Sequence, residues 1–379
     1  MIPTDMIHEI LLRLPAKSAG RFRCVSKLWS SIITRPDFIR SFGSPSSTRL
    51  CLLICARTLN KCRIFNSIPQ HEHPDRTYNP HVEKYEIYAP RVYHYHGSET
   101  VHGLTYLADP YGNIIVWNPT IRQHVKLPRP SERLFVCNFL GYDPVEDKYK
   151  VLCISICRYQ DPLVFTLGPQ ESWRVAQNNL THSPSRTFGA RGICINGHVY
   201  YEAEIQYRVG DTFKTEDNLM SFDVRYEKFN VIIKPANDKL CDCFFNYSGK
   251  VAWLCSDVSC IRFWVLEDKE KQEWSPRKFP LPFPRLRDPI WLVVLRLRGI
   301  THDTCEFIYT CTTLEAIYVL YYDPKRNRIR RVKYEGLQEE EEDFLKNNIE
   351  ENIHYYPNHC ESLVSLKDVP GFEPDWLRI

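Results

Sequence analysis

The spacing of apolar residues changes once along the chain, near residue 43, and this change restricts the folds available to it. Upstream, Ile7, Ile10, Leu11 and Leu14 recur at helical spacing, and a second helical stripe follows at Phe22, Val25, Trp29, Ile32 and Ile33. Downstream, apolar and polar residues alternate in short strands, such as residues 50–56, 114–117, 150–156 and 250–254. We therefore predict a helical unit at residues 1–42, a linker at 43–48, an all-β domain at 49–366 and a tail at 367–379.

A weak repeat of about 50 residues runs through the β region. Its mark is an apolar strand end followed by Asn or Asp, at Asn66, Asn118, Asp223, Asp268 and Asp323, with Gly168 as a poorer member. Asx residues favour the first position of a type I turn, so each mark predicts a hairpin. We assign Asp143 to a further turn inside one unit. A repeat made only of strands predicts a kelch-like β-propeller, and the alternative is a two-sheet β-sandwich.

The end of the β region returns to strand character at residues 361–366, with the sequence ESLVSL. A strand this late, after a long acidic loop, suits a propeller whose last strand pairs into the first blade. We therefore expect this segment to close the ring.

Charge and cysteine content exclude several classes of protein. The chain carries 49 basic and 46 acidic residues, a net charge of +3, which is too balanced for a dedicated nucleic-acid binder. No apolar run is long enough to span a membrane, and the N-terminus lacks a basic segment of the secretory type. The 15 cysteines are odd in number and scattered, so we expect reduced thiols. These features predict a protein of the nucleus or cytoplasm, not a secreted one.

No residue pattern points to catalysis, to a cofactor or to a metal. Histidines gather at His71, His73, His81, His94, His96 and His102, but no Cys-x-x-Cys pair accompanies them. Proline-rich surroundings instead indicate an exposed loop. The chain has no Gly-rich phosphate loop, no Gly-x-Ser-x-Gly motif and no His-Glu-x-x-His motif. We therefore expect no catalytic residue, no cofactor-binding residue and no metal site.

The N-terminal unit is too small to bury two apolar stripes by itself. It also carries seven basic and three acidic residues, in contrast to the balanced charge of the rest of the chain. Both features predict that it contacts another surface, on this chain or on a second protein.

Three sequence blocks in register give the N-terminal unit a resemblance to the F-box. They are the opening Ile2-Pro3 pair, EILLRLP at residues 9–15 and RCVSKLW at residues 23–29. The remainder resembles the plant F-box-associated domain of the third type, through FLGYDPVEDKYKVL (139–152), LGPQESWR (167–174), FDVRYEKF (222–229), NYSGKVAW (246–253) and WVLEDKEKQEW (264–274). Together the two resemblances cover nearly the whole chain.

The resemblance implies a non-catalytic subunit that recognises substrates for an SCF-type (Skp–cullin–F-box) ubiquitin ligase. The F-box would dock on a Skp-like adaptor and, through it, on a cullin and a RING subunit, while the β domain would bind an unidentified protein substrate. By analogy, the residues that meet the adaptor or support the docking surface are Ile2, Pro3, Ile7, Ile10, Leu11, Leu14, Pro15, Cys24, Val25 and Trp29. Two alternatives are an F-box scaffold or decoy outside a ligase and, more remotely, a propeller enzyme such as a kelch-type oxidase or cyclase.

Overall fold

The structure is a computed structural model of the whole chain. It describes residues 3–42, 50–57, 61–65, 77–78, 84–88, 100–108, 112–130, 136–156, 160–177, 180–185, 192–209, 212–235, 241–255, 260–281, 296–312, 317–334 and 353–372. The predicted linker at 43–48 and all of the clustered histidines except His102 lie outside these ranges.

Four short helices form the N-terminal unit: α1 (Thr4–Leu12), α2 (Ala16–Phe22), α3 (Lys27–Ile33) and α4 (Pro36–Phe42). The second apolar stripe spans two of these helices, because the chain leaves helical conformation after Arg23. Ser26 is fully extended there, with φ −161° and ψ 163°, and its side chain accepts a hydrogen bond from the Trp29 backbone N–H. The serine is thus an N-cap that starts α3 and separates it from α2.

In the described part of the chain six sheets follow, and all but one of their strand pairs are antiparallel. The first contains β25 (Ile353–His359), β1 (Cys51–Arg57), β2 (Lys61–Phe65) and β4 (Lys84–Tyr88), and the second contains β5 (Thr105–Ala108), β6 (Ile114–Asn118) and β7 (Gln123–Lys126). The third contains β8 (Val136–Asp143), β9 (Lys148–Ser155), β10 (Leu163–Thr166) and β11 (Arg174–Val175), and the fourth contains β12 (His182–Pro184), β13 (Gly192–Ile195), β14 (His198–Val209), β15 (Thr212–Asp223) and β16 (Phe229–Ile232).

The fifth sheet contains β17 (Cys241–Tyr247), β18 (Lys250–Cys255), β19 (Cys260–Asp268) and β20 (Glu273–Pro280). The sixth contains β21 (Arg296–Ile300), β22 (Phe307–Thr312), β23 (Ile317–Asp323) and β24 (Arg328–Tyr334), with β3 (Thr77–Tyr78) added in parallel to β24.

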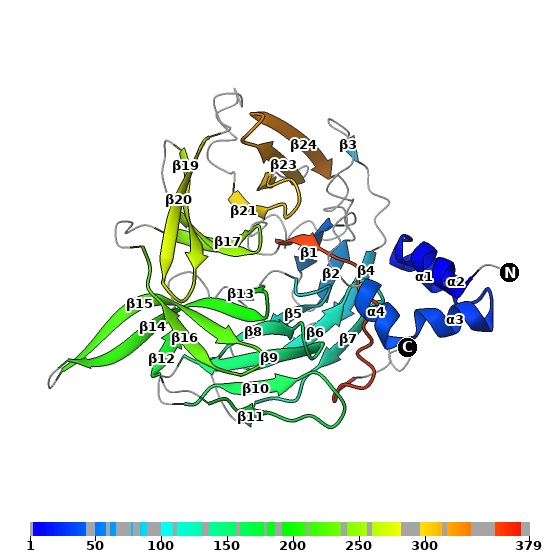
Figure 1. Cartoon of the computed structure of the whole chain (residues 1–379), viewed down its shortest axis with the longest axis horizontal. Coiled ribbons are helices and arrows are strands. Elements are labelled where there is room, and N and C mark those ends of the chain that lie inside the picture. Colours follow the sequence, from blue (N-terminus) through cyan, green and yellow to red (C-terminus); the bar gives the residue numbers. More distant parts are fainter. Residues whose placement is uncertain are drawn as a thin grey trace.

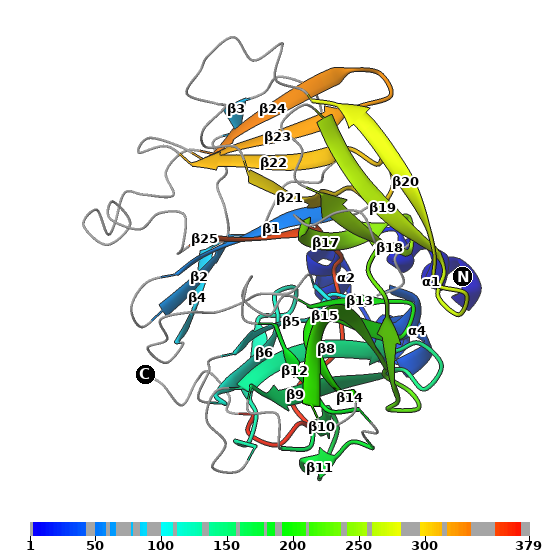
Figure 2. The ribbon, with the colours of Figure 1, turned by 90° about the vertical axis from the view of Figure 1, so that its left-hand side faces the viewer.

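The sheets are arranged radially, in chain order. Their innermost strands touch in the sequence β5, β8, β13, β17, β21 and β25, and Figures 1 and 2 show the sheets around a common centre. Trp117 of β6 meets Tyr356 of β25 edge to face, with 6.3 Å between ring centroids, and so joins the second sheet to the first. This arrangement is a β-propeller, as the repeat predicted, and it excludes the two-sheet sandwich.

Buried apolar side chains fill the spaces between neighbouring sheets. Phe139 of the third sheet stacks on Tyr201 of the fourth, with ring centroids 4.7 Å apart. Phe263 of the fifth sheet lies edge-on to Phe307 of the sixth, at 6.1 Å. Because each cluster draws on two sheets, no sheet buries its apolar face without its neighbour.

The Asx residues of the repeat that the structure describes form the predicted turns, while Asn66 lies outside the described residues. Asn118 Oδ1 accepts a hydrogen bond from the Thr120 N–H at 3.0 Å. The Oδ1 atoms of Asp143, Asp223, Asp268 and Asp323 each accept hydrogen bonds from the backbone N–H groups two and three residues later. Asp143 joins β8 to β9, inside its sheet, whereas Asp223, Asp268 and Asp323 precede β16, β20 and β24, the last strand of each sheet in chain order. One carboxylate oxygen therefore organises each turn, and the 50-residue period reflects the same hairpin recurring in successive sheets.

A left-handed residue completes each of these four turns and the turn that follows Asn118. The residues four positions after the Asx residue all have positive φ: Arg122, Asp147, Glu227, Gln272 and Asn327, with values from 50° to 57°. None is glycine, and for Arg122, Glu227 and Gln272 the left-handed conformation costs about 1 kcal/mol. The Asx hydrogen bonds offset this cost and bring the chain back into the next strand.

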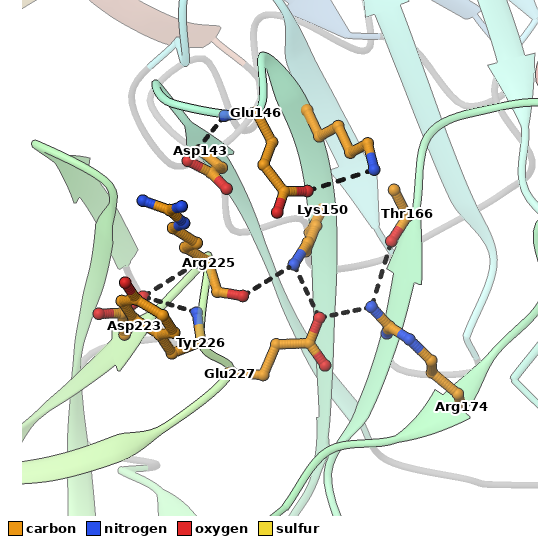
Figure 3. Close-up of polar contacts among 10 residues, drawn as sticks. Asp143, Glu146, Lys150, Thr166, Arg174, Asp223, Arg225, Tyr226 and Glu227 are labelled. Atoms are coloured by element: carbon orange, nitrogen blue, oxygen red, sulfur yellow. Dashed lines mark hydrogen bonds and ion pairs between the residues drawn. The ribbon is translucent and has the colours of Figure 1, made fainter.

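An ion-pair cluster ties the third sheet to a turn of the fourth (Figure 3). The Lys150 ammonium, which is 7% exposed, lies 2.8 Å from the Glu227 carboxylate and 3.4 Å from the carbonyl oxygen of Arg225. Arg174 pairs with the same Glu227 oxygen and donates to the Thr166 hydroxyl at 3.3 Å. Glu227 is also the left-handed residue of its turn, and this backbone conformation places its carboxylate beside Lys150.

Two expectations were wrong. Residues 361–366 are not a strand, and the ring is closed by β25, whose Tyr356 lies opposite Leu53 of β1. The alternation in ESLVSL arises because Leu363 packs against the N-terminal helices, whereas Ser362 and Val364 bond to the second sheet. The cysteines are not all reduced either, since Cys55 on β1 is bonded in a disulfide. Spacing along the chain does not show which cysteines meet in the fold.

The Asx turn at Asp268 provides a test of the repeat. We expect Asp268→Ala to lower the free energy of unfolding, because the backbone N–H groups of Glu270 and Lys271 lose their acceptor. Asp268→Asn keeps an acceptor oxygen while removing the charge, and should lose less than half as much. Urea unfolding would measure both variants, and equal losses would contradict a role for the turn hydrogen bonds.

Candidate functional site

The N-terminal helices enclose a small apolar core of their own. The fully buried members are Ile7, Leu11, Ala16, Ala19, Ile32, Ile33, Phe38 and Phe42. Leu363, from the other end of the chain, packs against the same cluster. The helices therefore do not stand alone, and part of their apolar surface is covered by the C-terminal segment (residues 361–372).

The structure divides the predicted site residues into two sets. Ile7 and Leu11 are buried, and Leu14 and Trp29 are half-buried against the helical core. Pro3, Ile10, Pro15, Cys24 and Val25 are exposed, and Ile2 lies outside the described residues. The first set supports the helices from within, while the second is available to another molecule.

The exposed apolar residues form two groups. On α1, Met6 and Ile10 lie one turn apart, and around the start of α3, Val25 and Leu28 are three residues apart. Met6 and Leu28 were missed in the sequence, although their helical spacing from Ile10 and Val25 was a usable signal. We take these two groups of exposed apolar side chains as the candidate surface of the helical unit.

Trp29 joins the core to the surface. Its indole stacks on Phe22 of α2, with ring centroids 4.9 Å apart and planes 30° from parallel. The side chain is half-buried, so it connects α2 to α3 while one edge remains accessible. Removing it would therefore affect both the stability of the helices and any surface beside it.

A carboxylate from the C-terminal segment caps α2. The N-cap residue of α2 is Pro15, and no side-chain hydrogen bond caps the helix locally. Glu361 supplies the missing acceptor: its Oε2 atom takes a hydrogen bond of 2.8 Å from the Ala16 backbone N–H, 345 residues away in the chain. A negative charge at a helix N-terminus also interacts favourably with the helix dipole.

The same segment is fastened to the second sheet. The Asn118 side-chain amide donates to the carbonyl oxygens of Ser362 and Val364, both at 3.0 Å, and the Ser362 N–H donates to the Thr120 hydroxyl. Gly103 makes room for it, because a Cβ atom there would lie 2.4 Å from the Ser362 Cβ. Residues 361–364 thus contact the helices on one side and the propeller on the other.

A second connection runs through α4. Arg40 donates to Asp147 at 2.9 Å, and the Tyr142 hydroxyl donates to the other oxygen of the same carboxylate at 2.7 Å. The His102 ring lies against the Tyr142 ring, with centroids 4.1 Å apart. Burial lowers the pKa of His102 to about 4 and raises that of Tyr142 above its usual range, so both groups are neutral at physiological pH.

The described residues contain no group of three or more His, Cys, Asp and Glu side chains placed to hold a metal ion. Nor do they include a helix with the length and apolar character needed to cross a membrane.

Comparison with known families identifies both parts of the chain. The family model for the F-box domain matches residues 1–41, and the model for the F-box associated beta propeller domain matches residues 51–360. The chain belongs to the F-box protein family. Its four helices are the F-box, and its six sheets are the F-box associated propeller.

Relatives in Arabidopsis thaliana resemble this F-box protein over nearly their full lengths. The F-box protein At4g21240 is 55% identical over 97% of this chain and 91% of its own. The F-box protein At5g18160 is 38% identical over 96% of this chain, and F-box protein DOR is 32% identical over 89%. Among solved structures, TolB from Acinetobacter baumannii aligns with a TM-score of 0.41 at 8% identity, covering 81% of this chain and 70% of its own.

The cap on α2 can be tested by hydrogen exchange. We expect Glu361→Ala to speed exchange of the α2 amides about tenfold, since loss of a capping acceptor costs about 1 kcal/mol or slightly more. Glu361→Gln keeps an acceptor oxygen and serves as the matched control, with a smaller effect. Unchanged α2 exchange in the alanine variant would show that the long-range cap does not stabilise the helix.

Buried histidines predict the response to acid. The pKa values of His102 and His359 are both lowered to about 4 by burial, whereas an unfolded histidine titrates near 6.5. Between these values the unfolded chain binds protons that the folded chain does not, so stability falls as the pH falls from about 6.5 to 4. At pH 4.5, each histidine should lower the free energy of unfolding by about 2.5 kcal/mol relative to its value at pH 7.

His102→Asn should remove most of the loss of stability at low pH that His102 causes. Asparagine does not titrate, and it tolerates the left-handed backbone at this position. Urea unfolding at pH 7 and pH 4.5 would measure the difference. An equal loss of stability in the variant and the wild type would refute the assignment of His102.

Proposed function

We propose that this F-box protein is the substrate-recognition subunit of an SCF-type ubiquitin ligase. In this proposal the F-box docks on a Skp-like adaptor, which links it to a cullin and a RING subunit, and the propeller captures the protein to be ubiquitinated. The chain itself is non-catalytic. Its substrate is unidentified, and we expect the complex to work in the nucleus, the cytoplasm or both.

The observation that carries the proposal is the division of apolar residues in the F-box. The F-box has its own apolar core, and Met6, Ile10, Val25 and Leu28 lie outside that core and remain exposed. Exposed aliphatic side chains in two groups provide the apolar centre that a protein interface needs. The net positive charge of the F-box favours encounter with an acidic adaptor surface.

The second support is the way the F-box is attached. A recognition subunit must present its substrate at a fixed position relative to the adaptor. Here the Glu361 cap, the packing of Leu363 and the Arg40–Asp147 ion pair hold the helices against the propeller at three separate points. Such an attachment suits a rigid spacer between two bound proteins.

Substitutions on the F-box surface test the docking. We expect Ile10→Asp and Val25→Asp each to weaken capture of a Skp-like adaptor at least tenfold, because a desolvated charge would replace an apolar contact. Melting of the full chain should change little, since both residues are exposed. Val145→Asp makes the same exchange at an exposed valine on the propeller and should leave capture unchanged.

Adaptor capture that survives both F-box substitutions would overturn the docking surface. Co-purification of a cullin with the wild-type chain separates a ligase subunit from a decoy, because a decoy could bind the adaptor alone. Adaptor binding without any cullin would therefore contradict the ligase proposal while leaving the docking surface intact.

A further inference from the structure

The hairpin of β14 and β15 extends beyond its sheet. Each strand has 12 residues, but β12 pairs with β14 only at residues 203–205, and β16 pairs with β15 only at residues 219–222. The rest of the hairpin, residues 206–209 and 212–217, forms a two-stranded arm. Figure 1 shows this arm projecting on the side away from the F-box helices, and Figure 2, viewed from that side, agrees.

One edge of the arm offers unpaired backbone groups. Within the described ranges, no strand pairs with β15 over residues 212–218 on the side away from β14. The Gln206 N–H, opposite Thr215 on the arm, donates away from β15 to the Thr181 carbonyl. Because hydrogen-bonding direction alternates along an antiparallel pair, the N–H and C=O groups of Phe213, Thr215 and Asp217 point to the open edge.

The side chains along this edge are complementary to themselves. If two copies of β15 pair antiparallel around a two-fold axis at Thr215, Thr215 meets Thr215 and Phe213 meets Asp217 of the other copy. Lys214 then lies opposite Glu216 of the other copy, and the reverse, which gives two ion pairs. The backbone pattern agrees with this register, since Phe213, Thr215 and Asp217 would form the hydrogen-bonded pairs and Lys214 and Glu216 the closer, non-hydrogen-bonded ones.

Other symmetric registers lack this match. Centring the axis at Phe213 places Lys214 opposite Thr212, and centring it at Asp217 places Glu216 opposite Asn218, so neither pairs opposite charges. The register centred at Asp217 would also place the second copy beside residues 219–222 of β15, which already pair with β16. A single register therefore satisfies the charges and the free backbone groups together.

We propose that the arm is a homodimerisation element, in which the open edge of β15 pairs with the same edge of a second copy of this chain. The contact is isologous and closes on itself, so it yields a dimer and not a filament. Residues 212–217 are all exposed in the single chain, and Phe213, 68% exposed, would be covered across the seam. Tyr207, whose hydroxyl donates to Glu216 on the same face, would hold that carboxylate beside the incoming lysine.

The dimer leaves both F-box surfaces free, because the arm lies on the opposite side of the propeller. The inference is therefore independent of adaptor binding. A seam of this length is smaller than a standard protein interface, so we expect a dissociation constant on the order of micromolar to tens of micromolar.

A charge-reversal series on the full chain tests the register. Lys214→Glu places Glu opposite Glu216, and Glu216→Lys places Lys opposite Lys214, so each variant should dimerise at least tenfold more weakly than the wild type. An equimolar mixture of the two variants restores two opposite-charge pairs and should form a heterodimer of near wild-type affinity. Lys228→Glu, an exposed reversal on the turn between β15 and β16, is the matched control and should dimerise normally.

Thr215→Pro provides a second, independent variant. Its N–H points to the open edge, so proline should leave the β14–β15 pairing intact while removing the central hydrogen bonds of the seam. Sedimentation equilibrium and light scattering would measure all of these proteins. A wild type that stays monomeric at about a hundred micromolar, or single reversals that dimerise as tightly as the wild type, would overturn the proposal.

Discussion

The pairing of β25 with β1 is the contact on which the rest of the molecule depends. Five of the six sheets are built mainly from consecutive strands, but the first needs residues from both ends of the chain, with Tyr356 opposite Leu53. Without this pairing the ring has two open edges. The apolar contacts of the first sheet with the sixth and second sheets also lose Ile353 and Tyr356 of β25. The pairing also fixes where residues 361–372 emerge, and therefore which surface the F-box can occupy.

The fold could be predicted where local chemistry determines it. Asp223, Asp268 and Asp323 organise turns through their own carboxylates, so a short pattern carries the hairpin and its period. The closing strand could not be found in this way. The sequence indicated a strand at residues 361–366, whereas in the completed ring residues 353–359 are the ones that pair with β1.

The candidate site was half predictable for a similar reason. Helical spacing placed Ile7 and Ile10 in one stripe, but the core of the four helices selects Ile7 and leaves Ile10 outside. The break at Ser26 could have been noticed, because serine is a favoured N-cap. The residue that caps α2 could not have been predicted, since nothing in the sequence near Ala16 indicates an acceptor as distant as Glu361.

The dependence of α2 on Glu361 has a consequence for how the protein is made. The F-box is synthesised before the propeller, yet its cap and the leucine that packs against its core follow the propeller in the chain. A chain truncated before Glu361, by a premature stop or by proteolysis, loses the α2 cap and the packing of Leu363. A chain truncated before β25 also loses the strand that closes the ring. Loss of residues 361–363 thus acts directly on the N-terminal helices, although they lie more than 300 positions away in the chain.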